Sequence, residues 1–289
     1  MKLTYSIVAR CPNTGDLGVA VQSHWFSAGV VCWAKAGVGA VATQAMALID
    51  HGPLGINEMG KGSSAVDALE LRLSMDENPE IRQVAMIDSS GTVAVHTGSE
   101  TIPESGHIVG ENFACQANMM WNSTVWQSMH DEFTNFHGDL ADRMLAALYA
   151  AELDGGDIRG MQSARILVVS AEPNAKPWLE TIVDIRVDDH PEPLTEITRL
   201  LELHRAYTSL GEETFDESSN NMEIPEIAFW RSIELANMGR HEEARALSSI
   251  AILDHKGWKE LLIRCSNSGL AGINDETVRI LIDYHPDDD

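Results

Sequence analysis

The sequence predicts an α+β protein in which two stacked, mostly antiparallel sheets are flanked by helices and followed by an all-helical tail. Pairs of strands joined by turn residues, such as TYSIVAR and LGVAVQS around NTGD, indicate hairpins rather than crossover connections. The helices come in pairs between the strand pairs, whereas a parallel, doubly wound sheet needs a helix after each strand. Beyond residue 226 the apolar period is that of helices alone.

Each element is predicted from its own pattern. The first stretch alternates and is rich in β-branched side chains, which is typical of a strand. Ser63 and Ser64 precede an apolar-periodic run and indicate the N-cap of a helix. The expected strands are 4–10, 17–23, 30–35, 38–44, 83–87, 92–97, 113–119, 164–170 and 179–187. The expected helices are 53–61, 65–75, 121–136, 139–153 and 196–207, and then 227–239, 241–253, 257–269 and 274–284.

An acidic stretch rich in Ser and Asn, residues 209–225, is the predicted linker between a domain at 1–208 and a helical domain at 226–289. In the helical domain, the run FWRSIELANMGRHEEARALSS has the small-residue and Gly-turn spacing of one TPR-like helical hairpin. One repeat is too short for a solenoid. We therefore expect a helical appendage that packs on the first domain or on a neighbouring chain.

Composition argues against two classes of partner. The chain has 289 residues, with 20 basic and 44 acidic side chains, and a formal charge of −24. This field repels phosphate backbones and anionic lipid heads, so we expect neither nucleic acid nor a membrane as a partner. The N-terminal stretch MKLTYSIVARCPNTG lacks the apolar run of a secretory signal or a membrane anchor, which predicts a cytoplasmic protein.

The sequence predicts neither a metal nor a cofactor. The cysteines are widely separated, so their thiols are expected to be reduced and mostly buried. The histidines do not form a His-x-x-x-His pair, which argues against a structural metal site. Gly37 and Gly39 lack the third spaced glycine and the following helix of a dinucleotide-binding loop. Phosphate-binding, nucleophile-elbow and His-Glu-x-x-His motifs are missing from the sequence as well.

What remains is a set of polar side chains carried on the predicted strands. Hydroxyl and amide groups fixed at strand ends can bind a carbonyl group or hold an oxyanion. Alternatively, they satisfy turns and caps, which is the ordinary role of such side chains. The set comprises Thr4, Ser6, Ser23, Thr43, Gln44, Gln116 and Asn118.

Two charged segments are further candidates. Asp188 and His190 lie in the sequence Asp-Asp-His-Pro after a strand, where they could bind a substrate, although the sequence also suits the start of a helix. Asp157, Arg159 and Gln162 follow a double glycine. We interpret that segment as a solvated turn, with an ion pair or a substrate clamp as the alternatives.

Several blocks of the sequence together resemble a known family. TYSIVARCPNTGDLGVAVQS, WAKAGVGAVATQA, RQVAMID, FACQANMM, GGDIRGMQSARILVV and DIRVDDHPEPLTEITRLLELH are similar to DUF1028, a bacterial family of unknown function. The resemblance spans about residues 4 to 206, and the helical tail resembles a region that some members carry. It implies the N-terminal nucleophile hydrolase fold, a four-layer αββα sandwich.

That resemblance implies a chemistry for Thr4. In this superfamily a Thr, Ser or Cys that begins the first strand attacks an amide carbonyl, and its own α-amine is the general base. While Met1, Lys2 and Leu3 remain attached, the nitrogen of Thr4 is an amide, so cleavage after Leu3 is required. Alternatively, Thr4 is only a β-branched strand residue. Lys35 matches a lysine that tunes the nucleophile in some relatives, although an exposed lysine beside a turn is the reading we favour.

The resemblance, together with Thr4, therefore implies an amidohydrolase that acts on a small amide. The alternative is a catalytically inactive member that binds a small metabolite in the same cleft, and a third possibility is a scaffold that acts through the tail. We expect a homodimer, because amphipathic helices and exposed sheet faces leave apolar surface to cover. The catalytic candidates are Thr4, Thr43 and Asn118, and the substrate-binding candidates are Ser6, Ser23, Gln44, Gln116, Asp188 and His190.

Overall fold

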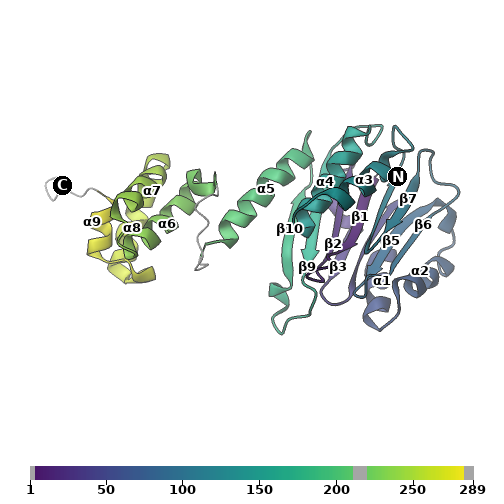
Figure 1. The fold of residues 1–289 in the computed structure, drawn as a ribbon, viewed down its shortest axis with the longest axis horizontal. Coiled ribbons are helices and arrows are strands. Elements are labelled where there is room, and N and C mark those ends of the chain that lie inside the picture. The colour runs from purple at the N-terminus through teal and green to yellow at the C-terminus, as the bar shows by residue number, and fades with distance from the viewer. Residues whose placement is uncertain (1–3, 211–219, 283–289) are drawn as a thin grey trace. The chain divides into compact units, whose positions relative to one another are not determined.

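The computed structural model describes residues 4–210 and 220–282 (Figure 1). The chain divides into two compact units, Met1–Leu201 and Glu202–Asp289. The first unit holds the strands of the described residues, and the described part of the second holds only helices. Most of the predicted linker, residues 211–219, lies outside the described residues.

The strands form two sheets in which all neighbours are antiparallel, as predicted. The six-stranded sheet has the order β10-β9-β2-β1-β8-β7, and the four-stranded sheet has the order β3-β4-β5-β6. The strands are β1 Thr4–Arg10, β2 Leu17–Ser23, β3 Cys32–Lys35, β4 Gly39–Ala45, β5 Arg82–Asp88, β6 Val93–Thr97, β7 Gly106–Gly110, β8 Phe113–Asn118, β9 Ser163–Val169 and β10 Thr181–Val187.

The hairpin of β1 and β2 follows from the alternation seen in the sequence. Tyr5 and Ile7 pack in the core under the helices, whereas Val8 packs in the core between the sheets, as expected for neighbours on a pleated strand. The turn between the strands includes Gly15 at φ 81°, a conformation that glycine adopts without steric cost. The register of this hairpin places Tyr5 opposite Gln22.

Helices cover the outer face of each sheet. The helices α3 and α4 pack on the six-stranded sheet, and α1 and α2 pack on the four-stranded sheet, so the layers are helices, sheet, sheet, helices (Figure 1). A separate apolar core fills the space between the sheets. The helices of the first unit are α1 His51–Gly60, α2 Ala65–Ser74, α3 Val125–Asn135 and α4 Leu140–Leu153. A further helix, α5 Pro193–Thr208, begins in the first unit and continues past Leu201 into the second.

Two positions show how the sequence sets the helices on the four-stranded sheet. Ser64 caps α2 by accepting a hydrogen bond from the backbone N–H of Asp67, which confirms the predicted N-cap. In α1, a Cβ atom on Gly52 would lie 2.0 Å from Cε3 of Trp33. Glycine is needed there because α1 and β3 approach each other so closely.

The second unit is built from short helices around its own apolar core. That core includes Phe229, Ile233, Leu262 and Leu281, and the rings of Phe229 and Trp258 lie 5.0 Å apart. The helices are α6 Pro225–Asn237, α7 His241–Asp254, α8 Gly257–Ser268 and α9 Asp275–Leu281. They match the predicted number and order of helices in the described part of the tail, while the TPR-like relationship stays a prediction.

The sequence-based element assignment was wrong in a few places. β7 was not predicted, because GHIVG is short, has a glycine at both ends and is only half-buried. Val30 and Val31 belong to the 3-10 helix Ala28–Val31 rather than to β3. Within residues 4–210 and 220–282, none of the helices is long and apolar enough to cross a membrane.

Candidate functional site

A group of buried polar side chains, which we call the Thr4 cluster, lies where β1 begins. Its members come from β1, β2 and β8 of one sheet and from β4 and β5 of the other. Each member is at most 1% exposed, and the side-chain polar atoms of such buried residues usually have a partner within the protein; Oε1 of Gln116 is buried without one among the described residues. The Thr4 cluster consists of Thr4, Ser6, Ser23, Gln44, Gln83, Gln116 and Asn118.

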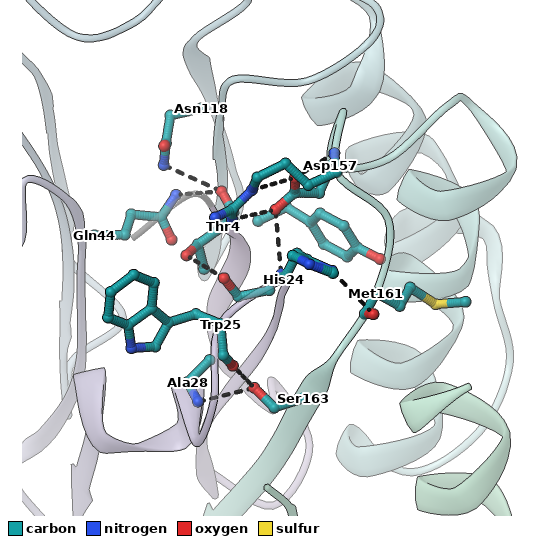
Figure 2. A network of polar contacts seen from close by, with 12 residues as sticks. Thr4, His24, Trp25, Ala28, Gln44, Asn118, Asp157, Met161 and Ser163 are labelled. Carbon is teal, nitrogen blue, oxygen red and sulfur yellow. Dashed lines mark hydrogen bonds and ion pairs between the residues drawn. The ribbon is translucent and has the colours of Figure 1, made fainter. Parts of the chain in front are cut away.

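Thr4 is held by side chains from both sheets. Its hydroxyl donates a hydrogen bond to Oγ of Ser23 at 3.2 Å. Its carbonyl oxygen accepts from Nε2 of Gln44 at 3.0 Å and from Nδ2 of Asn118 at 3.2 Å (Figure 2). The start of β1 is therefore clamped from the four-stranded sheet on one side and from β8 on the other.

Gln83 joins the two amides that clamp Thr4. Its Oε1 accepts from Nε2 of Gln44 at 2.6 Å and from Nδ2 of Asn118 at 3.0 Å. Its Nε2 lies within hydrogen-bonding distance of the carbonyl oxygen of Ala117 at 2.9 Å. Sequence reasoning missed this residue, although a glutamine that opens the apolar strand QVAMI was the signal that could have found it.

Ser6 and Gln116 form the deeper part of the Thr4 cluster. The Ser6 hydroxyl donates to Oε1 of Gln44 at 2.7 Å, and Nε2 of Gln116 donates to Ser6 at 3.1 Å. The same Nε2 is 3.3 Å from the carbonyl oxygen of Ala42. Six of the nine predicted site residues are thus brought together, namely Thr4, Ser6, Ser23, Gln44, Gln116 and Asn118.

Thr43 is not part of this cluster. It lies on β4 between Ala42, which packs between the sheets, and Gln44, so its side chain points to the opposite face, under α1. Its hydroxyl is 3.4 Å from the carbonyl oxygen of Leu48. Lys35 is exposed and pairs with Gly39, at the end of β4 remote from Gln44.

Asp157 is a buried carboxylate at the same end of the sheets. It is 1% exposed and pairs with Arg159, whose Nη2 lies 3.0 Å from Oδ2. The same carboxylate accepts from the backbone N–H of His24 at 3.2 Å (Figure 2). Our interpretation of this segment as a solvated turn was therefore wrong, because its carboxylate is desolvated and held by an ion pair.

Tyr5 and Glu152 form a second polar contact on the opposite face of β1. The Tyr5 hydroxyl donates to Oε2 of Glu152 at 2.9 Å. Burial raises the pKa of Tyr5 well above its usual value, and burial also raises the pKa of Glu152. A Cβ on Gly156 would lie 2.3 Å from Oε2 of Glu152, so glycine lets the loop pass close to this carboxylate.

Asp188 and His190 lie next to the loop that follows β2. The carbonyl oxygen of Asp188 accepts from the backbone N–H of Ser27 at 2.9 Å, and the carboxylate of Asp188 is bound by Arg186. The backbone N–H of His190 donates to the carbonyl oxygen of Gln162 at 2.8 Å. These contacts hold a loop beside the Thr4 cluster and do not include Thr4 itself.

A buried ion-pair group fixes the ends of β4 and β5. Nε of Arg82 lies 2.8 Å from Asp76, and Nε2 of His51 lies 2.9 Å from the same carboxylate. Arg82 also donates to the carbonyl oxygen of Met46, just beyond β4. The hydrogen bonds from Arg82 hold the pKa of Asp76 well below its usual range, and burial lowers the pKa of His51. This group supports the strand ends that carry Gln44 and Gln83.

Backbone strain gathers at the same end of the first unit. Ser27, Ala45 and Met119 have φ values of 58°, 64° and 59°, in the left-handed region that residues other than glycine rarely adopt. They lie in or beside the loops that follow β2, β4 and β8. Such strain persists where the surroundings hold the backbone in place, and it concentrates at functional sites.

Comparison with known proteins gives a consistent result. The model of the family described as "Family of unknown function (DUF1028)" matches residues 4–197. The chain is also similar to the crystal structure of protein SPO2555 from Silicibacter pomeroyi, a DUF1028 protein, with 29% sequence identity and a TM-score of 0.63. That match covers 73% of this chain and 88% of the other. No curated protein matches the chain.

Proposed function

Because the chain belongs to the DUF1028 family, as its sequence blocks predicted, we propose a function from its own Thr4 cluster: the hydrolysis of a small amide with Thr4 as the nucleophile. The first unit is, on this proposal, a sandwich of the N-terminal nucleophile hydrolase type. The observation that carries the proposal is the position of the Thr4 hydroxyl, at the beginning of β1 and among buried polar groups from both sheets.

The proposed reaction begins with hydrolysis of the peptide bond between Leu3 and Thr4, which gives Thr4 a free α-amine. This amine takes the proton of the Thr4 hydroxyl as Oγ1 attacks the carbonyl carbon of the substrate. The C–N bond of the substrate then breaks, and the proton passes to the leaving amine. A water molecule that has lost a proton to the α-amine hydrolyses the acyl ester, which releases the acid and restores Thr4.

Several features support this role. The carbonyl oxygen of Thr4 is clamped by Gln44 and Asn118, so the residue is held in one place before any substrate binds. Preorganised groups of this kind lower a reaction barrier because they do not have to reorganise during the reaction. Ser23, whose Oγ is 3.2 Å from that of Thr4, can orient the hydroxyl.

The test uses a variant that lacks Lys2 and Leu3, so that removal of Met1 exposes Thr4. Mass spectrometry of the purified protein identifies its first residue, and release of amine from a panel of small amides reports activity. We expect hydrolysis by this variant, loss of activity in its Thr4→Ala form and partial activity in its Thr4→Ser form. Thr134→Ala removes an exposed hydroxyl on α3 and is the matched control.

If a protein that begins with Thr4 releases no amine from any of these amides, Thr4 is not a nucleophile for such substrates. The second candidate function is then a catalytically inactive site that binds a small metabolite. It is favoured because the side-chain N–H groups of Gln44 and Asn118 already donate hydrogen bonds to Thr4 and Gln83 of the same chain. A ligand that binds only the folded protein raises its melting temperature, so a thermal-shift screen of metabolites tests this second candidate.

A further inference from the structure

We propose that residues 24–28, which we call the aromatic loop, recognise an apolar group of an uncharged substrate at the Thr4 site. The proposal rests on the proposed function for the position of the reacting bond. The aromatic loop follows directly on Ser23, whose hydroxyl contacts Thr4. The aromatic loop therefore begins one residue after a direct hydrogen-bond partner of the proposed nucleophile.

The backbone of the aromatic loop is fixed by buried polar groups. The hydroxyl of Ser163 donates to the carbonyl oxygen of Trp25 at 2.5 Å and accepts from the N–H of Ala28 at 2.9 Å (Figure 2). The N–H of His24 is bound by Asp157, and the N–H of Ser27 is bound by the carbonyl oxygen of Asp188. Contacts at both ends and in the middle hold the aromatic loop in one conformation.

This rigid backbone presents two large aromatic side chains to solvent. Trp25 is 40% exposed and Phe26 is 64% exposed. In Figure 2 the indole of Trp25 extends from the aromatic loop on the side of Gln44, in the part of the molecule that holds Thr4. An ordered loop that exposes aromatic rings beside a functional group is typical of a binding surface, because little entropy is lost when a ligand covers it.

Other loops at this end add apolar surface. These loops follow β4 and β8 and precede β9. β4 and β8 end beside members of the Thr4 cluster, and the start of β9 pairs with the end of β2, which carries Ser23. The exposed apolar side chains on these loops are Met46, Ile49, Trp121 and Ile158, all at least 41% exposed.

Charge narrows the class of ligand. The buried carboxylate of Asp157 is compensated by Arg159, so this pair adds no net charge that would attract either an anion or a cation to the strand ends. The whole chain carries a formal charge of −24, which disfavours anionic ligands at long range. The occupant that fits is therefore an uncharged amide with an aryl or alkyl group, the amide at Thr4 and the apolar group against Trp25 and Phe26.

The test measures binding rather than turnover, in the Thr4→Ala form of the variant that lacks Lys2 and Leu3. The probes are 4-fluorophenylacetamide and fluoroacetamide, whose binding is followed by fluorine NMR. We expect the aryl probe to bind at least about tenfold more tightly, because it buries more apolar surface. The double change Trp25→Ala and Phe26→Ala should remove that preference. The single change Trp25→Phe should keep part of it.

Trp178→Ala is the matched control. Trp178 is 74% exposed and lies before β10, whose start pairs with Val169 at the opposite end of β9 from Ser163. This change should leave both affinities unchanged. An equal loss in Trp178→Ala and in the double variant would overturn the proposal, and so would the absence of binding by the aryl probe.

The same variants separate this proposal from the proposed function. Binding that depends on the aromatic loop, without hydrolysis by the protein that begins with Thr4, supports the recognition surface and rejects the nucleophile. Hydrolysis with no preference for the aryl amide and no effect of the double change rejects the recognition surface alone. If the double change instead lowers the molar mass measured by light scattering and leaves probe affinity unaltered, the surface joins two copies of the chain and the proposal is wrong.

Discussion

Gln83→Met should destabilise the first unit strongly, because Gln83 is the shared partner of the amides that clamp Thr4. Its Oε1 accepts hydrogen bonds from Gln44 and Asn118, and its Nε2 lies within 3.1 Å of three acceptors, on Thr97, Gly106 and Ala117. Methionine keeps nearly the same shape and cannot replace these hydrogen bonds. The change therefore isolates the polar contribution from the packing contribution.

The magnitude follows from the groups that lose a partner. Gln44 and Asn118 each keep their hydrogen bond to the carbonyl oxygen of Thr4 and lose the one to Gln83. At least one acceptor of the Gln83 amide also loses its donor. A buried polar group left without a partner costs about 1–3 kcal/mol, so we expect a loss of about 3–5 kcal/mol in the free energy of unfolding after partial relaxation.

Urea unfolding followed by the infrared band of β-strands is the suitable assay, since the strands of the described residues all lie in the first unit. Gln127→Met is the control, because Gln127 is exposed on α3, where its amide donates a hydrogen bond to Asp131 at 2.7 Å. That control should change stability by less than about 0.5 kcal/mol. If Gln83→Met also stays within about 1 kcal/mol of the wild type, the reasoning from buried amide partners is refuted.

The pKa of Asp76 is lowered in the folded protein, so its carboxylate stabilises the fold above the unfolded-state pKa of about 3.9, and this stabilisation is lost as the pH falls. In urea titrations between about pH 5 and 2, the wild type should therefore lose stability more steeply than Asp76→Asn. Equal slopes would contradict this. Gly52→Ala should cost about 2 kcal/mol or more, because its methyl group meets an indole ring, whereas Gly60→Ala in the same helix, 3.7 Å from its nearest neighbour, should cost little or stabilise, as thermal unfolding will show. Tyr5→Phe removes the hydrogen bond that lowers the pKa of Glu152, so carboxyl NMR titration should find that pKa raised further, and an unchanged value would oppose the assignment.

Much of the fold could be predicted because its elements are encoded locally. The alternation of β1 and β2 and the glycine in their turn are visible in the sequence and produce the observed hairpin. The Ser64 cap likewise marks the start of α2 within the residues that form it. β7 escaped prediction because its pairing with β8 compensates for two glycines, and pairing is a property of the sheet rather than of the segment.

The candidate site was predicted only in part. Polar residues on strands stood out, and six of them meet in the Thr4 cluster, but Thr43 points to the other face because neighbouring strand residues alternate. Gln83 was missed, since nothing in its own segment shows that amides from two other strands converge on it. Asp157 was misread because its loop is polar in composition, while its burial depends on the chain that surrounds it.

The sequence alone determined the antiparallel hairpins, the paired helices, the family and the residue types available for chemistry, because these depend on patterns between near neighbours in the chain. The tertiary structure decided which polar side chains share one buried space and which loop begins beside Thr4. Those outcomes depend on the stacking of two sheets, which brings Gln44 to the carbonyl oxygen of a residue forty positions away at 3.0 Å. Burial strengthens such a hydrogen bond because it removes water as the competing partner.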